Sequence, residues 1–301
     1  MNQQRTRATH LLFTCLLAMA PIIASASTLE RVRASNTLTL GYLANFAPFS
    51  VQTGDKADGY AIDLCLKVAD KLKNELGLPT LQVRFQPVAS DDQMLAVSSG
   101  QVDILCTPTP PTLARRQQVS YSIPIYTAGL SAVVRQDASE SLLNVLDGKA
   151  ARTGPTWRAT VNHGLANQTY ATTAGGVTEA WVRQQMQWLG VVSSLVTVPD
   201  TAAGLKRVAD GQVDAFFAER MLLSNLLANQ PAAAKLVLLD RVFEYSPTAM
   251  ALAREDEDFR LLVDTALSQM YRSGEIEQAY ARHLGGVGEM ARKLFKVYAI
   301  P

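Results

Sequence analysis

Few residues of this chain stand where they could perform covalent chemistry. Beyond the N-terminal segment only two histidines remain, His163 and His283, and each stands alone, which is typical of a surface or packing residue. No Ser-His-Asp or Cys-His constellation is evident, and no phosphate-binding glycine loop is present. The sequence therefore predicts no metal and no cofactor, and it favours a non-enzymatic role.

The residues best suited to chemistry are ones that bind anions. Arg115 offers a guanidinium fork, which grips a carboxylate through two parallel hydrogen bonds. Gly176 and Val177 begin a predicted helix, whose free N–H groups attract anions. The alternatives are a solvated surface arginine and an ordinary strand-to-helix turn.

Two cysteines, Cys65 and Cys106, follow the N-terminal segment. Zinc sites need four ligands, which this chain does not cluster, whereas two cysteines in an oxidising compartment predict one disulfide.

The first residues predict that compartment. Arg5 and Arg7 precede an apolar run over 11–24, and Ala24-Ser-Ala26 supplies small residues for cleavage. A charged region, an apolar region and a small-residue exit are typical of a secretory signal peptide. A membrane anchor or a buried helix is the alternative, but the run is short for a span and contains Pro21. We expect a signal peptide over 1–26 and a periplasmic protein.

Composition narrows the function further. The chain has 28 basic and 27 acidic residues, and no basic block that would neutralise phosphates, which argues against nucleic-acid binding. Residues 27–301 are many for one core but suit two lobes.

Strands and helices alternate along the chain, which predicts a mostly parallel α/β sheet. A strand over 38–42 precedes a helix that carries Ile62, Cys65 and Leu72, and later helices include 139–146 and a long amphipathic one from Phe259. The segment Val97-Ser-Ser-Gly-Gln-Val-Asp103 nearly recurs as Val208-Ala-Asp-Gly-Gln-Val-Asp214. Each copy ends a helix at glycine and enters a buried strand, so we expect two lobes of related plan.

Thr112-Leu-Ala-Arg115 and Tyr121-Ser-Ile-Pro-Ile-Tyr126 follow the strand that contains Asp103. This order resembles the central motif of the family 3 extracellular solute-binding proteins, the polar amino-acid receptors of ABC importers. The resemblance continues in Ala47-Pro-Phe-Ser50, Gly59-Tyr-Ala-Ile-Asp-Leu64 and other stretches, and it covers nearly the whole mature chain. The cysteine pair is similar to that of the glutamate/aspartate-binding branch, and residues 137–168 match least.

The resemblance implies a type II periplasmic-binding-protein fold, in which two crossover strands join two lobes around a ligand cleft. Lobe 1 would comprise 27–128 plus 247–301 and lobe 2 would comprise 129–246, with the second crossover near 245–252. It also implies a monomeric receptor that hands its ligand to an ABC permease in the inner membrane.

The resemblance also assigns the site. Arg115 and the Val177 amide would hold the ligand's carboxylate, and Glu219, where the family usually has aspartate, would hold its ammonium; a salt bridge to Arg220 is the alternative. The remaining candidates are the aromatic residues Phe46 and Tyr60 around the ligand side chain, the hydroxyl donors Thr107 and Thr112, and Gly176, which lets an anion approach the helix start closely.

Departures from the family limit the ligand assignment. Pro110 stands where a backbone N–H normally helps to bind carboxylate. Leu43 and Gln93 stand where the acidic branch has arginines, so the sequence favours a neutral polar amino acid.

Two other functions stay open. The same fold hosts periplasmic dehydratases, in which Glu219 or Glu179 would be the general acid. A sensor subunit that presents ligand to a membrane kinase is the other.

Overall fold

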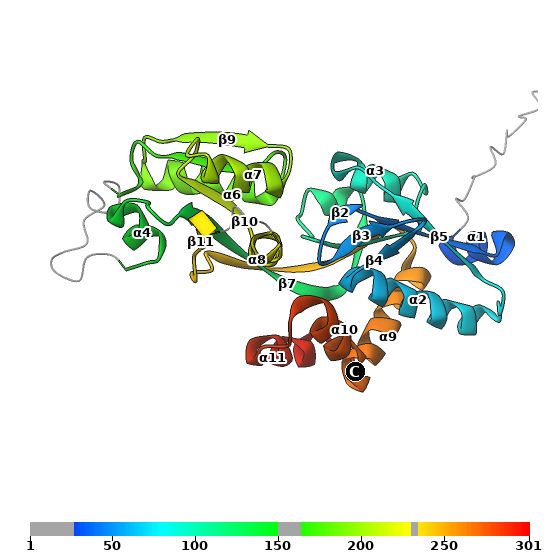
Figure 1. The fold of residues 1–301 in the computed structure, drawn as a ribbon. Helices are drawn as coiled ribbons and strands as arrows, with labels where there is room; N and C mark the ends of the chain where they lie inside the picture. Colours follow the sequence, from blue (N-terminus) through cyan, green and yellow to red (C-terminus); the bar gives the residue numbers. More distant parts are fainter. Residues whose placement is uncertain (1–26, 150–163, 230–233) are drawn as a thin grey trace, which may run out of the picture.

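The computed structural model describes residues 27–149, 164–229 and 234–301. Two α/β lobes are joined by a pair of long antiparallel strands, β7 (Ser120–Arg135) and β12 (Glu244–Leu252) (Figure 1). The second crossover predicted near 245–252 is thus confirmed. Below, lobe 1 denotes 27–128 and 247–301, and lobe 2 denotes 129–246. The proposed signal peptide over 1–26 and residues 150–163, part of the stretch that matches the family least, lie outside the described residues.

One sheet runs through both lobes in the order β5-β1-β6-β12-β7-β10-β8-β9, and β11 pairs with β7. Within each lobe the neighbouring strands β1, β5 and β6, or β8, β9 and β10, are parallel, as the alternation of strands and helices predicts. The strands at the junction, β12 and β7, are antiparallel to their neighbours.

Among the described residues, lobe 1 carries more helices than lobe 2 and the larger apolar core, in which α2 and α9 pack on the sheet. Its elements are β1 (Thr37–Tyr42), β5 (Gln82–Pro87), β6 (Ile104–Thr109), a small sheet of β2 (Asn45–Phe46), β3 (Ser50–Thr53) and β4 (Lys56–Asp58), the helices α1 (Thr28–Ser35), α2 (Tyr60–Leu76), α3 (Gln93–Ser98), α9 (Glu257–Ser273), α10 (Glu275–Leu284) and α11 (Glu289–Tyr298), and the short 3₁₀ turns Ser90–Asp92 and Arg115–Gln117.

Lobe 2 has apolar clusters on both faces of its part of the sheet. Its elements are β8 (Thr169–Thr173), β9 (Ser194–Val198), β10 (Ala215–Glu219), β11 (Leu236–Leu238), α4 (Glu140–Leu146), α6 (Val177–Leu189), α7 (Thr201–Ala209) and α8 (Arg220–Ala228).

The helix α2 begins where only glycine fits. Gly59 has φ +130°, and a Cβ atom there would lie 2.5 Å from the carbonyl oxygen of Phe49. This close approach holds the loop that contains Phe49 against the start of α2, where Ala61 N–H donates to the same carbonyl at 3.0 Å. The first turn of α2 thereby positions the aromatic loop of lobe 1.

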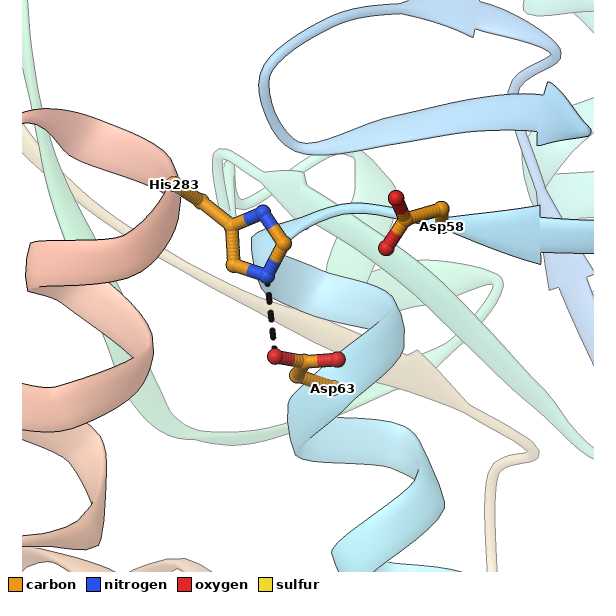
Figure 2. Close-up of side chains that lie close together, drawn as sticks. All are labelled: Asp58, Asp63 and His283. Carbon is orange, nitrogen blue, oxygen red and sulfur yellow. Dashed lines mark hydrogen bonds and ion pairs between the residues drawn. The ribbon is translucent and has the colours of Figure 1, made fainter.

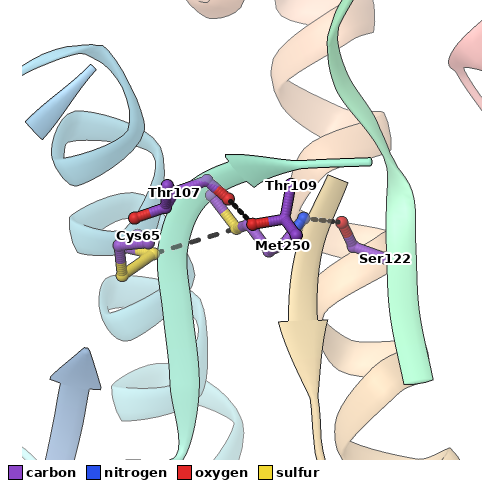
Figure 3. The surroundings of a disulfide bond; sticks show 6 residues. Cys65, Thr107, Thr109, Ser122 and Met250 are labelled. Carbon is purple, nitrogen blue, oxygen red and sulfur yellow. Dashed lines mark hydrogen bonds between the residues drawn. A yellow bond between two sulfur atoms is a disulfide. The ribbon is translucent and has the colours of Figure 1, made fainter. Parts of the chain in front are cut away.

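The predicted disulfide is present: Cys65 on α2 is bonded to Cys106 on β6 (Figure 3). Both half-cystines are fully buried, and the Cys65 sulfur lies 3.8 Å from Met250 Sδ on β12. The bond therefore ties the first long helix of lobe 1 to its central strand, next to the second crossover.

Three features of the fold were not anticipated. The long amphipathic helix expected from Phe259 breaks at Gly274, whose φ of +82° separates α9 from α10. The last helix, α11, and the small sheet β2-β3-β4 have no counterpart among the predicted elements. Among the described residues, no helix has both the length and the apolar character to cross a bilayer.

Candidate functional site

Glu219 lies at the end of β10 and forms the N-cap of α8. Its Oε2 accepts a hydrogen bond from the Leu222 N–H at 2.9 Å. Its Oε1 accepts bonds from the Tyr126 hydroxyl at 2.9 Å and from the Gly129 N–H at 3.4 Å, both on the crossover strand β7. The carboxylate thus joins α8 of lobe 2 to β7; the two connecting strands, β7 and β12, are called the hinge below. The carboxylate does not pair with Arg220, which instead lies 3.6 Å from Asp240.

Burial raises the pKa of Glu219, because desolvation disfavours its charged form more than the hydrogen bonds from Leu222, Tyr126 and Gly129 favour it. Glu179 differs. Hydrogen bonds from Arg183 and from the Gly175 N–H lower its pKa. Of the two carboxyl groups considered as a general acid, only Glu219 therefore has a pKa shifted in the direction that acid catalysis needs.

Tyr126 connects Glu219 to the aromatic loop of lobe 1. Its ring lies 4.8 Å from that of Phe49 and 6.1 Å from that of Tyr280, and the Phe49 ring lies 5.5 Å from that of Phe46. Sequence reasoning selected Phe46 but missed Phe49 and Tyr126, although both stand inside motifs that carry the family resemblance. The signal was available in Ala47-Pro-Phe-Ser50 and in the last residue of the 121–126 motif.

Tyr60, expected beside the ligand's side chain, lies in the core of lobe 1. Its side chain is fully buried, and its hydroxyl donates to the Ile125 carbonyl at 2.6 Å. Burial raises its pKa well above the usual range of tyrosine. As the first residue of α2, Tyr60 turns its ring into the lobe 1 core, where it supports Phe49 at 6.4 Å.

Arg115 opens a 3₁₀ turn at the edge of lobe 1. Its backbone N–H donates to Thr112 Oγ1 at 3.2 Å, so this threonine hydroxyl shapes the turn. The guanidinium donates from Nη1 to the Pro110 carbonyl at 3.2 Å, which uses one of its five N–H donors. The neighbour Arg116 is exposed and lies over the Tyr121 ring at 5.5 Å.

The hydroxyl of Thr107 is enclosed in lobe 1. Its side chain is 1% exposed, and Oγ1 has no hydrogen-bond partner among the described residues. Thr109 Oγ1 donates to the Thr107 carbonyl at 3.1 Å beside the disulfide (Figure 3). A ligand would reach the Thr107 hydroxyl only if its neighbours moved.

In lobe 2, Gly176 is the N-cap of α6 and Val177 its first residue. Within the described part of the chain neither N–H has an acceptor, while the preceding Gly175 N–H donates to Glu179 Oε2 at 2.8 Å. The helix start therefore keeps two free N–H donors, as an anion site requires. The third N–H, that of Gly175, is already bonded to Glu179.

These residues form three separate groups. The hinge group contains Glu219, Tyr126 and the Phe46–Phe49 pair, the second group surrounds Arg115, and the third is the start of α6. Among the described residues, no hydrogen bond or ring contact joins one group to another.

A partly open pocket of about 450 Å³ lies in lobe 2, and no member of the three groups lines it. Its wall is largely apolar and aromatic, with Tyr170, Trp181, Phe217 and Phe243 among its lining residues. Arg241 lies over the Phe243 ring at 5.0 Å, and its guanidinium donates to backbone carbonyls. We interpret this pocket as a feature of lobe 2 packing.

His283, which stands alone in the sequence, lies beside two carboxylates in the structure (Figure 2). Its Nε2 is 2.8 Å from Asp63 Oδ2, and a carboxylate oxygen of Asp58 lies close to both side chains. However, the Arg282 guanidinium already donates to Asp63 Oδ2 at 2.6 Å. We therefore interpret the cluster as an ion-pair junction that ties α10 to the start of α2.

The sequence model of the bacterial extracellular solute-binding proteins, family 3, matches residues 38–286. The chain belongs to this family. It is 27% identical over 280 residues to an L-glutamate/L-aspartate-binding protein of Pseudomonas aeruginosa, an alignment that covers 91% of this chain and 86% of the relative.

Two further likenesses are to an enzyme and to an ancestral binding protein. A cyclohexadienyl dehydratase of Pseudomonas aeruginosa is 24% identical over 87% of this chain and 88% of its own length. The crystal structure of an ancestral amino acid-binding protein, described as a precursor of cyclohexadienyl dehydratase, superimposes with a TM-score of 0.67 at 22% identity, over 86% of this chain and 100% of that one. This second likeness shows the type II binding-protein fold.

Proposed function

We propose that this protein is the periplasmic substrate-binding subunit of an ABC importer, and that it captures an amino acid by closing its lobes. One observation carries the proposal: a guanidinium fork in lobe 1 and a helix start with two free N–H groups in lobe 2 stand on lobes joined by only two strands. Both features bind carboxylates, and rotation about β7 and β12 would bring them to the same anion.

In this proposal Arg115 anchors the ligand's α-carboxylate on lobe 1. Its bond to the Pro110 carbonyl occupies Nη1 and leaves donors for a bidentate contact. The Gly176 and Val177 N–H groups then complete the carboxylate site from lobe 2. Pro110 supplies no N–H, so the helix start takes a larger share of the carboxylate than it would in a receptor with a donor at that position.

Glu219 is proposed to hold the ligand's ammonium. Donors from Tyr126, Gly129, Leu222 and Met221 surround its carboxylate, so the ammonium would have to share or displace one of these hydrogen bonds. A bound ammonium would favour the charged form and so offset the burial that raises the pKa of this carboxyl group.

The ligand's side chain is proposed to be neutral and polar. Burial of an unpaired charged side chain on closure costs several kcal/mol. Leu43 has no charge, and the Gln93 amide already donates to the Ser90 carbonyl at 2.7 Å. Receptors of this kind deliver to a membrane permease, and we expect this one to act as a monomer.

A thermal-shift panel of the twenty amino acids tests this function. Neutral polar amino acids should raise the melting temperature more than glutamate, aspartate, lysine or arginine, because the charged side chains would be buried without a partner. A ligand at 100 times its Kd adds about 2.7 kcal/mol to the free energy of unfolding. A shift with glutamate alone would contradict the neutral side chain, whereas no shift with any amino acid would contradict the ligand class. Mass spectrometry of ligand released by denaturation identifies what co-purifies.

A second candidate function, a dehydratase, is favoured by one observation. Glu219 has a longer side chain than the aspartate that the family usually has at this position. Its pKa is raised by burial, as a general acid requires. Incubation with a cyclohexadienyl substrate, followed by chromatography, separates the two functions. A receptor returns the compound unchanged, whereas an enzyme converts it and loses this activity in Glu219→Gln.

A further inference from the structure

Glu219 has no cationic partner within the described part of the chain. Its hydrogen bonds all come from neutral donors, which are the Tyr126 hydroxyl and the N–H groups of Gly129, Met221 and Leu222. A carboxylate that is withdrawn from water without a counter-charge is unfavourable. A cation that reaches Glu219 therefore favours its ionised form over its protonated form.

The titratable groups that face Glu219 from neighbouring elements are tyrosines. Burial raises the pKa of Tyr126 on β7, and burial together with the charge of Glu219 raises the pKa of Tyr280 on α10 to about 12. Both tyrosines therefore stay neutral between pH 5 and pH 7. Arg220 follows Glu219 in the chain, but its guanidinium lies 3.6 Å from Asp240. The charge at this place is thus set by Glu219 itself.

Tyr126 is the partner that can serve both charge states of Glu219. A backbone N–H can only donate, whereas a tyrosine hydroxyl donates to a carboxylate or accepts from a protonated carboxyl group. The Tyr126 side chain is 5% exposed, and its ring lies 4.8 Å from that of Phe49, so the hydroxyl is held in place. Because a hydrogen bond to a charged group is about twice as strong as a neutral one, this hydroxyl favours the ionised form.

We propose that the protein captures the ligand's ammonium in exchange for a proton of Glu219, and that Tyr126 is the positioning residue that sets this exchange. The O–H bond of the protonated carboxyl group breaks, its proton passes to solvent, and the carboxylate pairs with the ammonium. Glu219 is half-buried rather than enclosed, which leaves it accessible to both. The inference rests on the proposed function, since it takes the ammonium to bind at Glu219.

The exchange makes ligand affinity depend on pH in one direction. Below the pH at which the ligand-free carboxyl group ionises, affinity should fall up to tenfold per pH unit, because each bound ligand must first expel one proton. The ligand's own ammonium and the Arg115 guanidinium keep their charges up to pH 7, so neither produces this dependence.

Calorimetry with the amino acid that gives the largest thermal shift tests the exchange. In two buffers of different ionisation enthalpy, phosphate and imidazole, the parent protein should release protons as it binds, and its affinity should be lower at pH 5 than at pH 7. Tyr126→Phe loses a charge-assisted bond, so its ratio of affinities at pH 7 and pH 5 should be about tenfold larger. A merely structural role of Tyr126 would weaken binding equally at both pH values.

Tyr271→Phe is the matched control. It loses a hydroxyl bond of 2.6 Å to the Pro124 carbonyl, which lies on the same strand as Tyr126 but away from Glu219. Its ratio of affinities should equal that of the parent protein. The proton release of the parent protein decides the exchange even if Tyr126→Phe does not fold.

Carbon-13 titration of the glutamate carboxyl groups gives a ligand-free test, in which the signal absent from Glu219→Gln assigns the residue. The Glu219 midpoint should lie at higher pH in Tyr126→Phe than in the parent protein or Tyr271→Phe. Equal midpoints, or binding with neither proton release nor pH dependence, would overturn the proposal. If no amino acid binds, the proposed function fails and the exchange with it, whereas the carboxyl midpoints still decide the role of Tyr126.

Discussion

Lobe 1 and lobe 2 each place an aspartate at the start of a central strand. In lobe 1, Asp103 Oδ2 accepts from the Thr39 N–H at 2.8 Å, and the Asp103 N–H donates to the Thr39 carbonyl at 2.9 Å. In lobe 2, Asp214 makes the same two bonds with Thr169, both at 2.7 Å. The near repeat in the sequence thus corresponds to one hydrogen-bonded motif used twice.

The strands that follow are held differently. The strand in lobe 1 is tied by the Cys65–Cys106 disulfide. The position equivalent to Cys106 in lobe 2 is Phe217, whose ring lies among aromatic side chains at the wall of the 450 Å³ pocket. Asp103 also pairs with Arg31 at 2.7 Å. The comparison indicates a covalently fixed lobe 1 and a lobe 2 held by side-chain packing.

Removal of the disulfide should have the largest effect on stability. Cys65 and Cys106 close a loop of 41 residues in sequence, so Cys65→Ala/Cys106→Ala should lower the free energy of unfolding by about 4 kcal/mol. Urea denaturation of parent and variant, with and without reductant, measures this effect. Reductant should destabilise the parent and leave the variant unchanged, and equal sensitivity would contradict a structural disulfide.

The two aspartates provide a matched pair for the next effect. Each substitution of an aspartate by alanine leaves a backbone N–H without its charge-assisted hydrogen bond, which costs about 1.5–3 kcal/mol of stability. Asp103→Ala also breaks the bond to Arg31, so it should cost about 3 kcal/mol against about 2 kcal/mol for Asp214→Ala. Denaturant midpoints at a constant m-value check the order. A larger loss for Asp214→Ala would show that lobe 2 depends on its motif more than lobe 1 does.

The sequence predicted these shared features because they are local. The glycine that ends a helix, the aspartate that follows and the buried strand form one short pattern, and short apolar stretches located β1, β6 and β10. The crossover at 245–252 and the helix after Ser139 were also expected, and both are present.

Long-range contacts set what the sequence did not reveal. Tyr60 has the residue type of a ligand-stacking aromatic, but the helix start at Gly59 turns it into the core. His283 meets Asp63 only because α10 packs on α2. The contact of Tyr298 with Thr127 joins residues 171 apart in the chain, which no local pattern encodes.

The smallest effect concerns pH and the Glu219 carboxyl group. Because burial raises its pKa, the folded protein keeps this proton to a higher pH than the unfolded chain does, where the pKa of glutamate is about 4.3. Its contribution to stability is therefore fully present below the unfolded pKa and is lost as pH rises through the folded pKa.

Glu219→Gln retains a neutral side chain at every pH, so this loss should be absent from the variant. The stability difference between the parent protein and Glu219→Gln should move in the variant's favour from pH 4 to pH 8. Asp264, whose pKa is also raised by burial, is present in both proteins and cancels in the difference. If the stability difference between the two proteins did not change with pH, the raised pKa of Glu219 would be contradicted.

The proposed function depends on Arg115, the arginine that we propose to grip the ligand's carboxylate at the edge of lobe 1. Calorimetric titration with the best ligand should compare Arg115→Ala with Arg116→Ala, an adjacent exposed arginine of the same charge. Loss of a buried charge-assisted pair costs about 2–5 kcal/mol, or roughly 30- to 5,000-fold in affinity. We expect that loss for Arg115→Ala and a change within about threefold, the size of a rim-charge effect, for Arg116→Ala. If Arg115→Ala binds within threefold of the parent protein, Arg115 is not the carboxylate anchor and the proposed site is wrong.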